Sequence, residues 1–138
     1  MGIRGLAHVA IRARDLEASA RFYAEALGLR AGRRPPFGFP GRWLYGEDGA
    51  AIVHLFGADD AAARCYTGAA PNGGAGAVDH IAFAASDWPA TRTRLQGLGI
   101  TFQERQAPDT GAPQVFLRDP DGVTIELNFE GQGAGGRL

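Results

Sequence analysis

The chain contains two weakly similar halves, and this internal repeat constrains the fold more than any other feature of the sequence. His8 stands in a run of alternating apolar residues near the start of the first half, and His80 stands in the matching run of the second. A Leu-Gly pair follows each histidine at nearly the same interval, ending in Gly28 and in Gly99. The two halves are therefore expected to repeat one supersecondary unit.

The third histidine of the chain also has a counterpart in the repeat. Asp48-Gly49 precedes the apolar run that contains His54, and Asp121-Gly122 precedes the run that contains Glu126. An Asp-Gly pair between apolar runs is typical of a tight turn between two strands. Each half therefore offers one side chain that can bind a metal on its first strand and another on its last, and no histidine is left over.

The hydrophobic periodicity predicts the same order of elements, β-α-β-β-β, in each half. Asp15 is the expected N-cap of the first helix, Gly28 its stop, and Leu16, Ala20, Tyr23 and Leu27 its apolar stripe. In the first half, strands are expected over 5–12, 29–33, 42–46 and 50–56. In the second, a helix is expected to start near Asp87 and end before Gly99, with strands over 78–84, 100–104, 114–117 and 123–129.

These elements suit a single domain over 1–138, with module 1 over about 3–66 and module 2 over about 77–130. A Gly-rich stretch over 67–76 is expected to be a flexible linker, and 131–138 a disordered tail. The segments 33–41 and 106–113 are expected to be loops. The fold class is therefore α+β, with two repeated modules.

The expected alternation of each strand places the candidate ligands opposite the apolar core. His8 shares a face with Ala10, and His80 shares one with Ala82 and Ala84. The opposite faces carry the branched and aromatic residues that suit packing against the helices. Small alanines beside polar side chains leave the space that a ligand pocket needs.

Composition narrows the possible partners and the compartment. Fourteen basic and fifteen acidic residues give a formal net charge of -1, which argues against a nucleic-acid or anionic-membrane partner. Cys65 is the only cysteine, so no intramolecular disulfide is possible, and we interpret it as an inert thiol. The sequence shows no signal peptide and no apolar run long enough to span a membrane. A cytoplasmic location is expected.

A histidine on a strand is most often a structural or surface residue, and Glu126 could equally be a solvated residue on an open sheet face. The repeat changes this weighting, because three histidines and a glutamate occupy matching faces of equivalent strands. A divalent metal site built from His8, His54, His80 and Glu126 is therefore the favoured interpretation. Imidazole and carboxylate donors suit iron, nickel, cobalt, zinc or manganese.

Several motifs resemble the vicinal oxygen chelate superfamily, which includes glyoxalase I, methylmalonyl-CoA epimerase, extradiol dioxygenases and the fosfomycin- and bleomycin-resistance proteins. The resemblance covers about residues 5–130. The motifs that carry it are His8-Val9-Ala10-Ile11, Arg21-Phe22-Tyr23, Leu27-Gly28-Leu29, Asp79-His80-Ile81-Ala82-Phe83 and Leu117 to Leu127. The resemblance implies a U-shaped mixed-sheet cleft around one divalent metal, a glyoxalase-like fold.

By this resemblance, His8, His80 and Glu126 match the most regular metal positions of the superfamily, and His54 matches the fourth. That fourth position is glutamate in many glyoxalase I enzymes and glutamine in the epimerases. Glu126 is expected to be a catalytic general base, and His54 a ligand or an acid/base group. A carboxylate can leave the metal and accept a substrate proton.

Four functions remain open at this point. The preferred one is a lyase or isomerase that acts on a small substrate with vicinal oxygens through a metal-stabilised enediolate. An extradiol-type Fe(II) dioxygenase is the main alternative, with His54 standing off the metal. A thiol transferase of the fosfomycin-resistance type and a metal-free drug-binding protein are lesser ones.

Further side chains are candidates for the substrate cleft. Aromatic residues could line its apolar part, namely Phe37, Phe39, Trp43, Tyr45, Phe56 and Phe116. Arginines could hold an anionic group, namely Arg12, Arg33, Arg34, Arg42 and Arg118. A homodimer with two equivalent sites is expected, because a four-stranded module with open edges is marginal alone.

Overall fold

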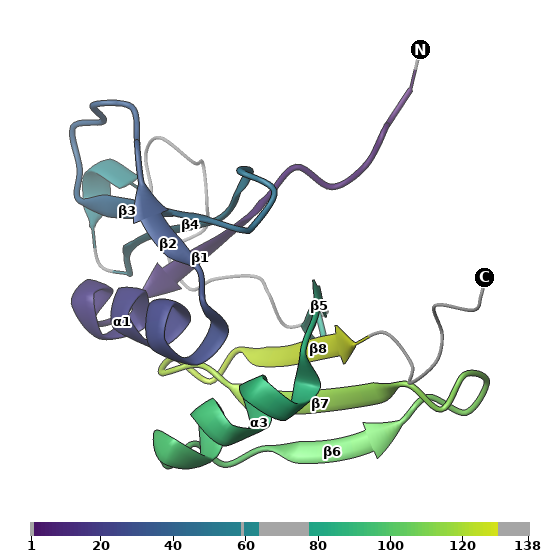
Figure 1. Ribbon diagram of the computed structural model, residues 1–138. Coiled ribbons are helices and arrows are strands. Elements are labelled where there is room, and N and C mark those ends of the chain that lie inside the picture. Colours follow the sequence, from purple (N-terminus) through teal and green to yellow (C-terminus); the bar gives the residue numbers. More distant parts are fainter. Residues whose placement is uncertain (1, 59, 64–77, 130–138) are drawn as a thin grey trace. The chain divides into compact units, whose positions relative to one another are not determined.

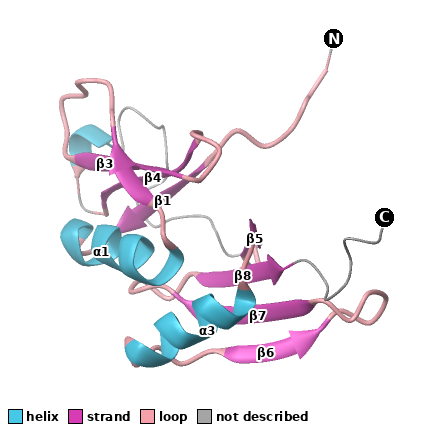
Figure 2. Ribbon diagram, in the orientation of Figure 1, coloured by secondary structure: helices cyan, strands magenta, loops and turns pink. Residues whose placement is uncertain are grey.

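The computed structural model describes residues 2–58, 60–63 and 78–129, and it divides into two compact units, Met1–Ala75 and Gly76–Leu138. Each unit holds one four-stranded sheet and its helix (Figures 1 and 2). The expected linker 67–76, the tail 131–138 and Cys65 lie outside the described residues. Among the helices that are described, none is long and apolar enough to cross a membrane.

The first unit has the element order β1 (Val9–Ala13), α1 (Leu16–Leu27), β2 (Arg30–Gly32), β3 (Gly41–Tyr45) and β4 (Ala51–Gly57). Its sheet has the strand order β1-β4-β3-β2. β1 runs parallel to β4, whereas β3 is antiparallel to both β4 and β2. The sheet is therefore mixed, as a β-α-β-β-β module requires when its last strand pairs in parallel with its first.

The second unit repeats this plan with β5 (Ile81–Ala85), α3 (Trp88–Gly97), β6 (Gln103–Gln106), β7 (Pro113–Arg118) and β8 (Thr124–Phe129). Its strand order is β5-β8-β7-β6, and β5 pairs with β8 in parallel. The predicted α+β fold with two β-α-β-β-β modules is confirmed. Strand ends differ from the expected ones by a few residues: β1 begins at Val9 rather than Gly5, and β6 begins at Gln103 rather than Ile100.

The register of the two sheets makes the repeat visible residue by residue. In the first sheet, His54 lies between Ala10 of β1 and Trp43 of β3. In the second, Glu126 lies between Ala82 of β5 and Phe116 of β7. His54 and Glu126 are therefore structural equivalents, each beside a small residue and an aromatic one.

The helix ends follow the sequence signals. Asp15 accepts a hydrogen bond from Ala18 N at 3.0 Å, and Gly28 closes α1 with a φ of 74°, in the left-handed region that glycine adopts without strain. Asp87 caps α3 by accepting from Ala90 N at 3.1 Å, and Pro89 lies in the first turn, where its missing N–H costs nothing. These signals fix where each helix leaves its sheet.

The core of each unit lies between the sheet and its helix. α1 packs against β2, β3 and β4, and its fully buried residues are Ser19, Tyr23 and Ala26. Tyr23 of the expected stripe is buried as predicted, whereas Leu16, Ala20 and Leu27 are only half-buried, and Ser19, which the stripe left out, is fully buried. In the second unit, the buried Leu95 and Trp88 of α3 cover the sheet, and the Trp88 ring lies 5.3 Å from that of Phe129.

Candidate metal-binding residues

The first unit brings His8 and His54 together, as the repeat predicts. His8 immediately precedes β1, and His54 lies in the middle of β4. Their rings stack with centroids 3.8 Å apart and planes 13° from parallel. Trp43 covers the other face of His54, with centroids 4.0 Å apart and planes at 12°. His54 is therefore the middle ring of a three-ring stack.

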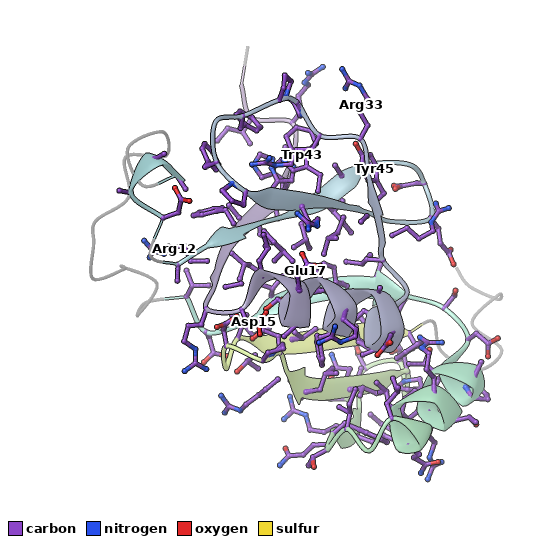
Figure 3. All side chains as sticks on the ribbon, turned by 90° about the vertical axis from the view of Figure 1, so that its left-hand side faces the viewer. Arg12, Asp15, Glu17, Arg33, Trp43 and Tyr45 are labelled. Atoms are coloured by element: carbon purple, nitrogen blue, oxygen red, sulfur yellow. The ribbon has the colours of Figure 1, made fainter. Side chains whose placement is uncertain are left out.

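This stack lies on the sheet face that α1 leaves open. Figure 3 shows Trp43 and α1 on opposite sides of the sheet, with Glu17 on the helix side. The neighbours of His54 along β4, Val53 and Leu55, are fully buried on the helix side. The strand alternation therefore places His54 where the sequence predicts, opposite the core.

The hydrogen bonding of His54 identifies the nitrogen that can bind a metal. Nε2 lies 3.2 Å from the carbonyl oxygen of Ala51, so this nitrogen carries the proton and donates it. Nδ1 then keeps the lone pair, and metal-binding histidines usually donate their other ring N–H to such a carbonyl. Burial and the neighbouring His8 lower the pKa of His54, and Arg34 adds to this effect, which favours the neutral ring that a metal requires.

The stacked arrangement limits what His8 and His54 can bind together. The lone pairs of imidazole lie in the ring plane, and a metal sits about 2.0–2.1 Å from a histidine nitrogen. Two nearly parallel rings with centroids 3.8 Å apart cannot both direct lone pairs at one ion. Both histidines can bind the same metal only if one of the rings turns out of the stack.

The second unit brings His80 and Glu126 together. His80 immediately precedes β5, and its Nε2 lies 3.0 Å from Oε1 of Glu126 on β8. Two ligands at about 2.1 Å from one ion and at right angles to each other are about 3.0 Å apart, so this pair has the spacing of adjacent ligands. The chemistry and spacing of these two donors fit a divalent metal.

Asp79 orients His80 from the other side of the ring. Its Oδ2 lies 2.7 Å from Nδ1 of His80. The hydrogen bond to Asp79 raises the pKa of His80, and the charge of Glu126 adds to it, although partial desolvation opposes both. The raised pKa favours the ring that is protonated on both nitrogens, so a metal would have to displace the proton on Nε2, and Asp79 on Nδ1 would then hold the tautomer that presents Nε2 to it.

Glu126 is a buried carboxylate, with 8% of its surface exposed. Besides His80, it receives a hydrogen bond at 3.4 Å from Nε2 of Gln114 on β7, and the same amide donates to Asn128 Oδ1 at 3.1 Å. A buried carboxylate needs such donors, because an unpaired charge there is costly. Glu126 is therefore held by two groups, His80 just before β5 and Gln114 on β7.

Asp79 and Gln114 were not among the site residues predicted from the sequence. Asp79 carries a signal in the sequence, because a carboxylate next to a candidate ligand can orient it. Gln114 carries none, since its contact with Glu126 depends on the pairing of β7 with β8. The predicted residues otherwise form two pairs, one in each unit. Within the described parts of the chain, no group of three or more His, Cys, Asp or Glu side chains could hold a metal ion. A site that unites the two pairs stays a prediction.

The aromatic and arginine candidates are spread over both units. Phe37, Phe39 and Trp43 form one cluster, in which the Phe37 centroid lies 5.3 Å from that of Phe39 and 6.4 Å from that of Trp43. Phe116 lies beside His80, with centroids 6.0 Å apart, and under the guanidinium of Arg105. Phe56 is buried and the Tyr45 hydroxyl donates to the carbonyl of Arg33. Aromatic side chains therefore flank a candidate ligand in each unit: Trp43 of the first cluster lies against His54, and Phe116 lies beside His80.

Comparison with known proteins identifies the family. A sequence model of the glyoxalase/bleomycin resistance protein/dioxygenase superfamily matches residues 5–127. The protein belongs to this superfamily, and the resemblance inferred from its motifs is confirmed.

Two similar proteins carry names from one enzyme class. The chain is 29% identical over 128 residues to an Arabidopsis thaliana protein named glyoxylase I 4, covering 91% of this chain and 70% of that protein. It is 28% identical over 125 residues to a lactoylglutathione lyase of Haemophilus influenzae, covering 87% of this chain and 88% of that enzyme. The crystal structure of lactoylglutathione lyase from Agrobacterium tumefaciens has the same fold, with a TM-score of 0.65, 24% identity, and coverage of 94% of this chain and 96% of that one.

Proposed function

We propose that this protein is a metal-dependent lyase or isomerase that converts the adduct of a thiol and an α-oxoaldehyde into a 2-hydroxyacyl thioester. The buried, oriented carboxylate of Glu126 carries the proposal. The names of the Arabidopsis and Haemophilus relatives support it. The metal ligands would be His8, His54, His80 and Glu126. For both histidines of the first unit to bind the same ion, either His54 or His8 would have to turn out of the stack.

The residues of the chain account for the proton transfer that this reaction needs. In the adduct, the carbon that carries the thiol and a hydroxyl group stands next to a carbonyl carbon. Glu126 takes the proton from the first carbon and returns it to the second, while the hydroxyl proton of the first carbon passes to the oxygen of the second, so the product is an isomer of the adduct. A bound divalent metal supplies polarisation of the two neighbouring substrate oxygens, which makes that proton more acidic.

The hydrogen bonds of Glu126 suit a group that must accept and release a proton. Gln114 and His80 hold the carboxylate but leave it near Ala82, whose small side chain leaves room beside it. Burial excludes water, which would otherwise exchange with the transferred proton. In the first unit, the stack of Trp43 on His54 adds a flat apolar surface beside the pair His8 and His54.

The test compares the wild-type protein and Glu126→Gln in their rates of turnover of the adduct of methylglyoxal and glutathione. We expect at least a ~100-fold lower rate with an unchanged circular dichroism spectrum, because general acid–base catalysis contributes about that much. Glu25→Gln is the matched control, because Glu25 is an exposed carboxylate on α1. Near-normal turnover by the Glu126 variant would remove this residue from the mechanism.

An Fe(II) extradiol-type dioxygenase is a second candidate, and one observation favours it. His54 is held in its stack by Trp43 and by the Ala51 carbonyl, so His8, His80 and Glu126 could form a set of two histidines and one carboxylate. Such a set leaves open positions for a catechol and dioxygen. Oxygen uptake with catechols by the iron-loaded protein, and no turnover of thiol adducts, would favour this function over the lyase.

A further inference from the structure

Arg34 differs in its surroundings from Arg42 and Arg118, two other arginines that the sequence suggested for an anionic group. Arg42 forms an ion pair with Glu17 of α1, so its charge is compensated. Arg118 donates from Nη1 to the carbonyl of Gly122 at 3.3 Å on the exposed surface of the second unit. Arg34, by contrast, is half-buried on the loop between β2 and β3. Its guanidinium contacts aromatic rings and backbone rather than a carboxylate.

Four contacts hold the guanidinium of Arg34 in place. Nη2 donates to the carbonyl oxygen of Phe39 at 3.0 Å. The guanidinium carbon lies 4.9 Å from the Phe37 centroid and 5.2 Å from the Phe39 centroid, within the range of cation–π attraction. At Gly41, an added Cβ would lie 2.6 Å from Nη2, so the group lies directly against the glycine backbone. Contacts within the chain therefore fix the orientation of this guanidinium.

The charge of Arg34 lacks compensation among the described residues. The hydrogen bond from Nη2 occupies one of the five N–H donors of the guanidinium. Among the residues that the structure describes, no carboxylate pairs with this guanidinium. Burial and the neighbouring charge of Arg42 lower its pKa, so the environment disfavours the cation. Partly burying an unpaired charge costs free energy, and an anion that accepts the remaining N–H groups would offset that cost.

Arg34 also lies on the sheet face that carries the candidate ligands. Gly41, against which it packs, is two residues from Trp43 on β3, and residues two apart share a face. Trp43 in turn stacks on His54. The aromatic cluster of Phe37, Phe39 and Trp43 therefore connects the guanidinium to the stacked histidines.

We propose that Arg34 is an anion subsite that binds a carboxylate of the substrate, with Phe37, Phe39 and Trp43 forming the apolar wall beside it. The ligand is thus a carboxylate with an adjoining apolar group. The planar guanidinium suits a carboxylate because it donates two parallel hydrogen bonds. The assignment of this ligand to the substrate, but not its binding, rests on the proposed function.

The test compares two ligands that differ only in the anionic group. N-acetyl-S-benzylcysteine carries a carboxylate and a benzyl group, and its carboxamide keeps the shape but loses the charge. Isothermal titration calorimetry with the full-length protein at about 0.15 M salt measures both affinities, and this salt screens distant charges. We expect the wild-type protein to bind the carboxylate at least ~10-fold more tightly than the carboxamide, which corresponds to about 1.4 kcal/mol.

Two substitutions locate the preference. Arg34→Gln is expected to reduce it to less than ~2-fold, because the charge-assisted hydrogen bonds are lost. Arg30→Gln, which removes the same charge from an exposed residue of β2, should retain it. Equal preference in the wild type and Arg34→Gln, or no preference in the wild type, would overturn the assignment. If the circular dichroism spectrum shows that Arg34→Gln does not fold, Arg34→Lys replaces it as the test. Lysine keeps the charge but not the planar pair of donors, so an unchanged preference for the carboxylate in this variant would contradict the proposal.

The outcome separates this proposal from the proposed function. Binding is measured without turnover, so a carboxylate preference that depends on Arg34 stands even if no thiol adduct is converted. Conversely, turnover that is equally fast with adducts of N-acetylcysteine and of its carboxamide, together with equal affinities, would refute the subsite and leave the lyase intact.

Discussion

A His8→Ala chain mixed with a Glu126→Ala chain tests how the two ligand pairs combine into a site. The structure places one pair in each compact unit, His8 with His54 and His80 with Glu126. We expect a homodimer, in which the two pairs of a site come either from one chain or from the two chains; recovery of activity on mixing is the outcome for a shared site. Neither variant alone should then be active, because every site in it lacks one ligand.

The expected recovery follows from counting sites. In a mixed dimer, one site combines both substituted units, whereas the other combines both intact units. Random exchange of equal amounts makes about half of the dimers mixed, because a twofold dimer has two equivalent positions. One intact site in half of the dimers restores about one quarter of the wild-type activity. The assay is turnover of the thiol adduct after subunit exchange.

Two controls make the result decisive. Mass spectrometry of differently tagged chains must show that exchange has occurred, and each variant incubated alone must stay inactive. No recovery despite proven exchange would place both pairs of a site in one chain. A protein that sediments as a monomer at micromolar concentration while fully active would refute the dimer itself.

Further predictions concern the histidines and the sheet. In an NMR titration of metal-free protein, His54 should titrate below the usual value of about 6.5, because burial and His8 lower its pKa. His80 should titrate above that value, because Asp79 and Glu126 raise its pKa. The reverse order would contradict the described contacts. Gly41→Ala should lower the free energy of unfolding by about 1–3 kcal/mol in urea, because its Cβ would lie 2.6 Å from the Leu55 carbonyl oxygen. Gly38→Ala, with open space at that position, is its control, and equal losses would contradict this reasoning.

The sequence predicted the order of helices and strands in the two modules, because short patterns of neighbouring residues in each half carry the repeat. Strand alternation and the Asp-Gly turns fix which residues share a face, so the residue pattern alone assigns His54 and Glu126 to equivalent positions. The predicted cap at Asp15 and the predicted helix start near Asp87 depend only on neighbouring backbone groups, and both were confirmed. Features set within a few residues are therefore readable from the sequence.

Features that depend on packing between elements were less accessible. The predicted α1 stripe included the buried Tyr23 but missed Ser19, a small polar residue that is fully buried, because the pattern of large apolar residues gives no sign of its burial. The stack of Trp43 on His54 requires the pairing of β3 with β4, and Gln114 meets Glu126 only through the pairing of β7 with β8. Such contacts join residues that are distant in the sequence.

The role of His54 decides between the two candidate functions, and His54→Phe is the sharpest variant for it. Phenylalanine keeps a flat ring between His8 and Trp43 but removes both nitrogens, so the stack and the fold should survive. If His54 is a ligand, as the lyase proposal requires, metal affinity measured by competition with a chelator should fall at least ~10-fold, the lower end of what lost metal-site interactions cost. His54→Ala, which removes the stacking ring as well, shows how much of any change comes from lost packing. Unchanged affinity in His54→Phe would mean that His54 never leaves its stack. The metal would then have three protein ligands, a set that favours the dioxygenase over the lyase.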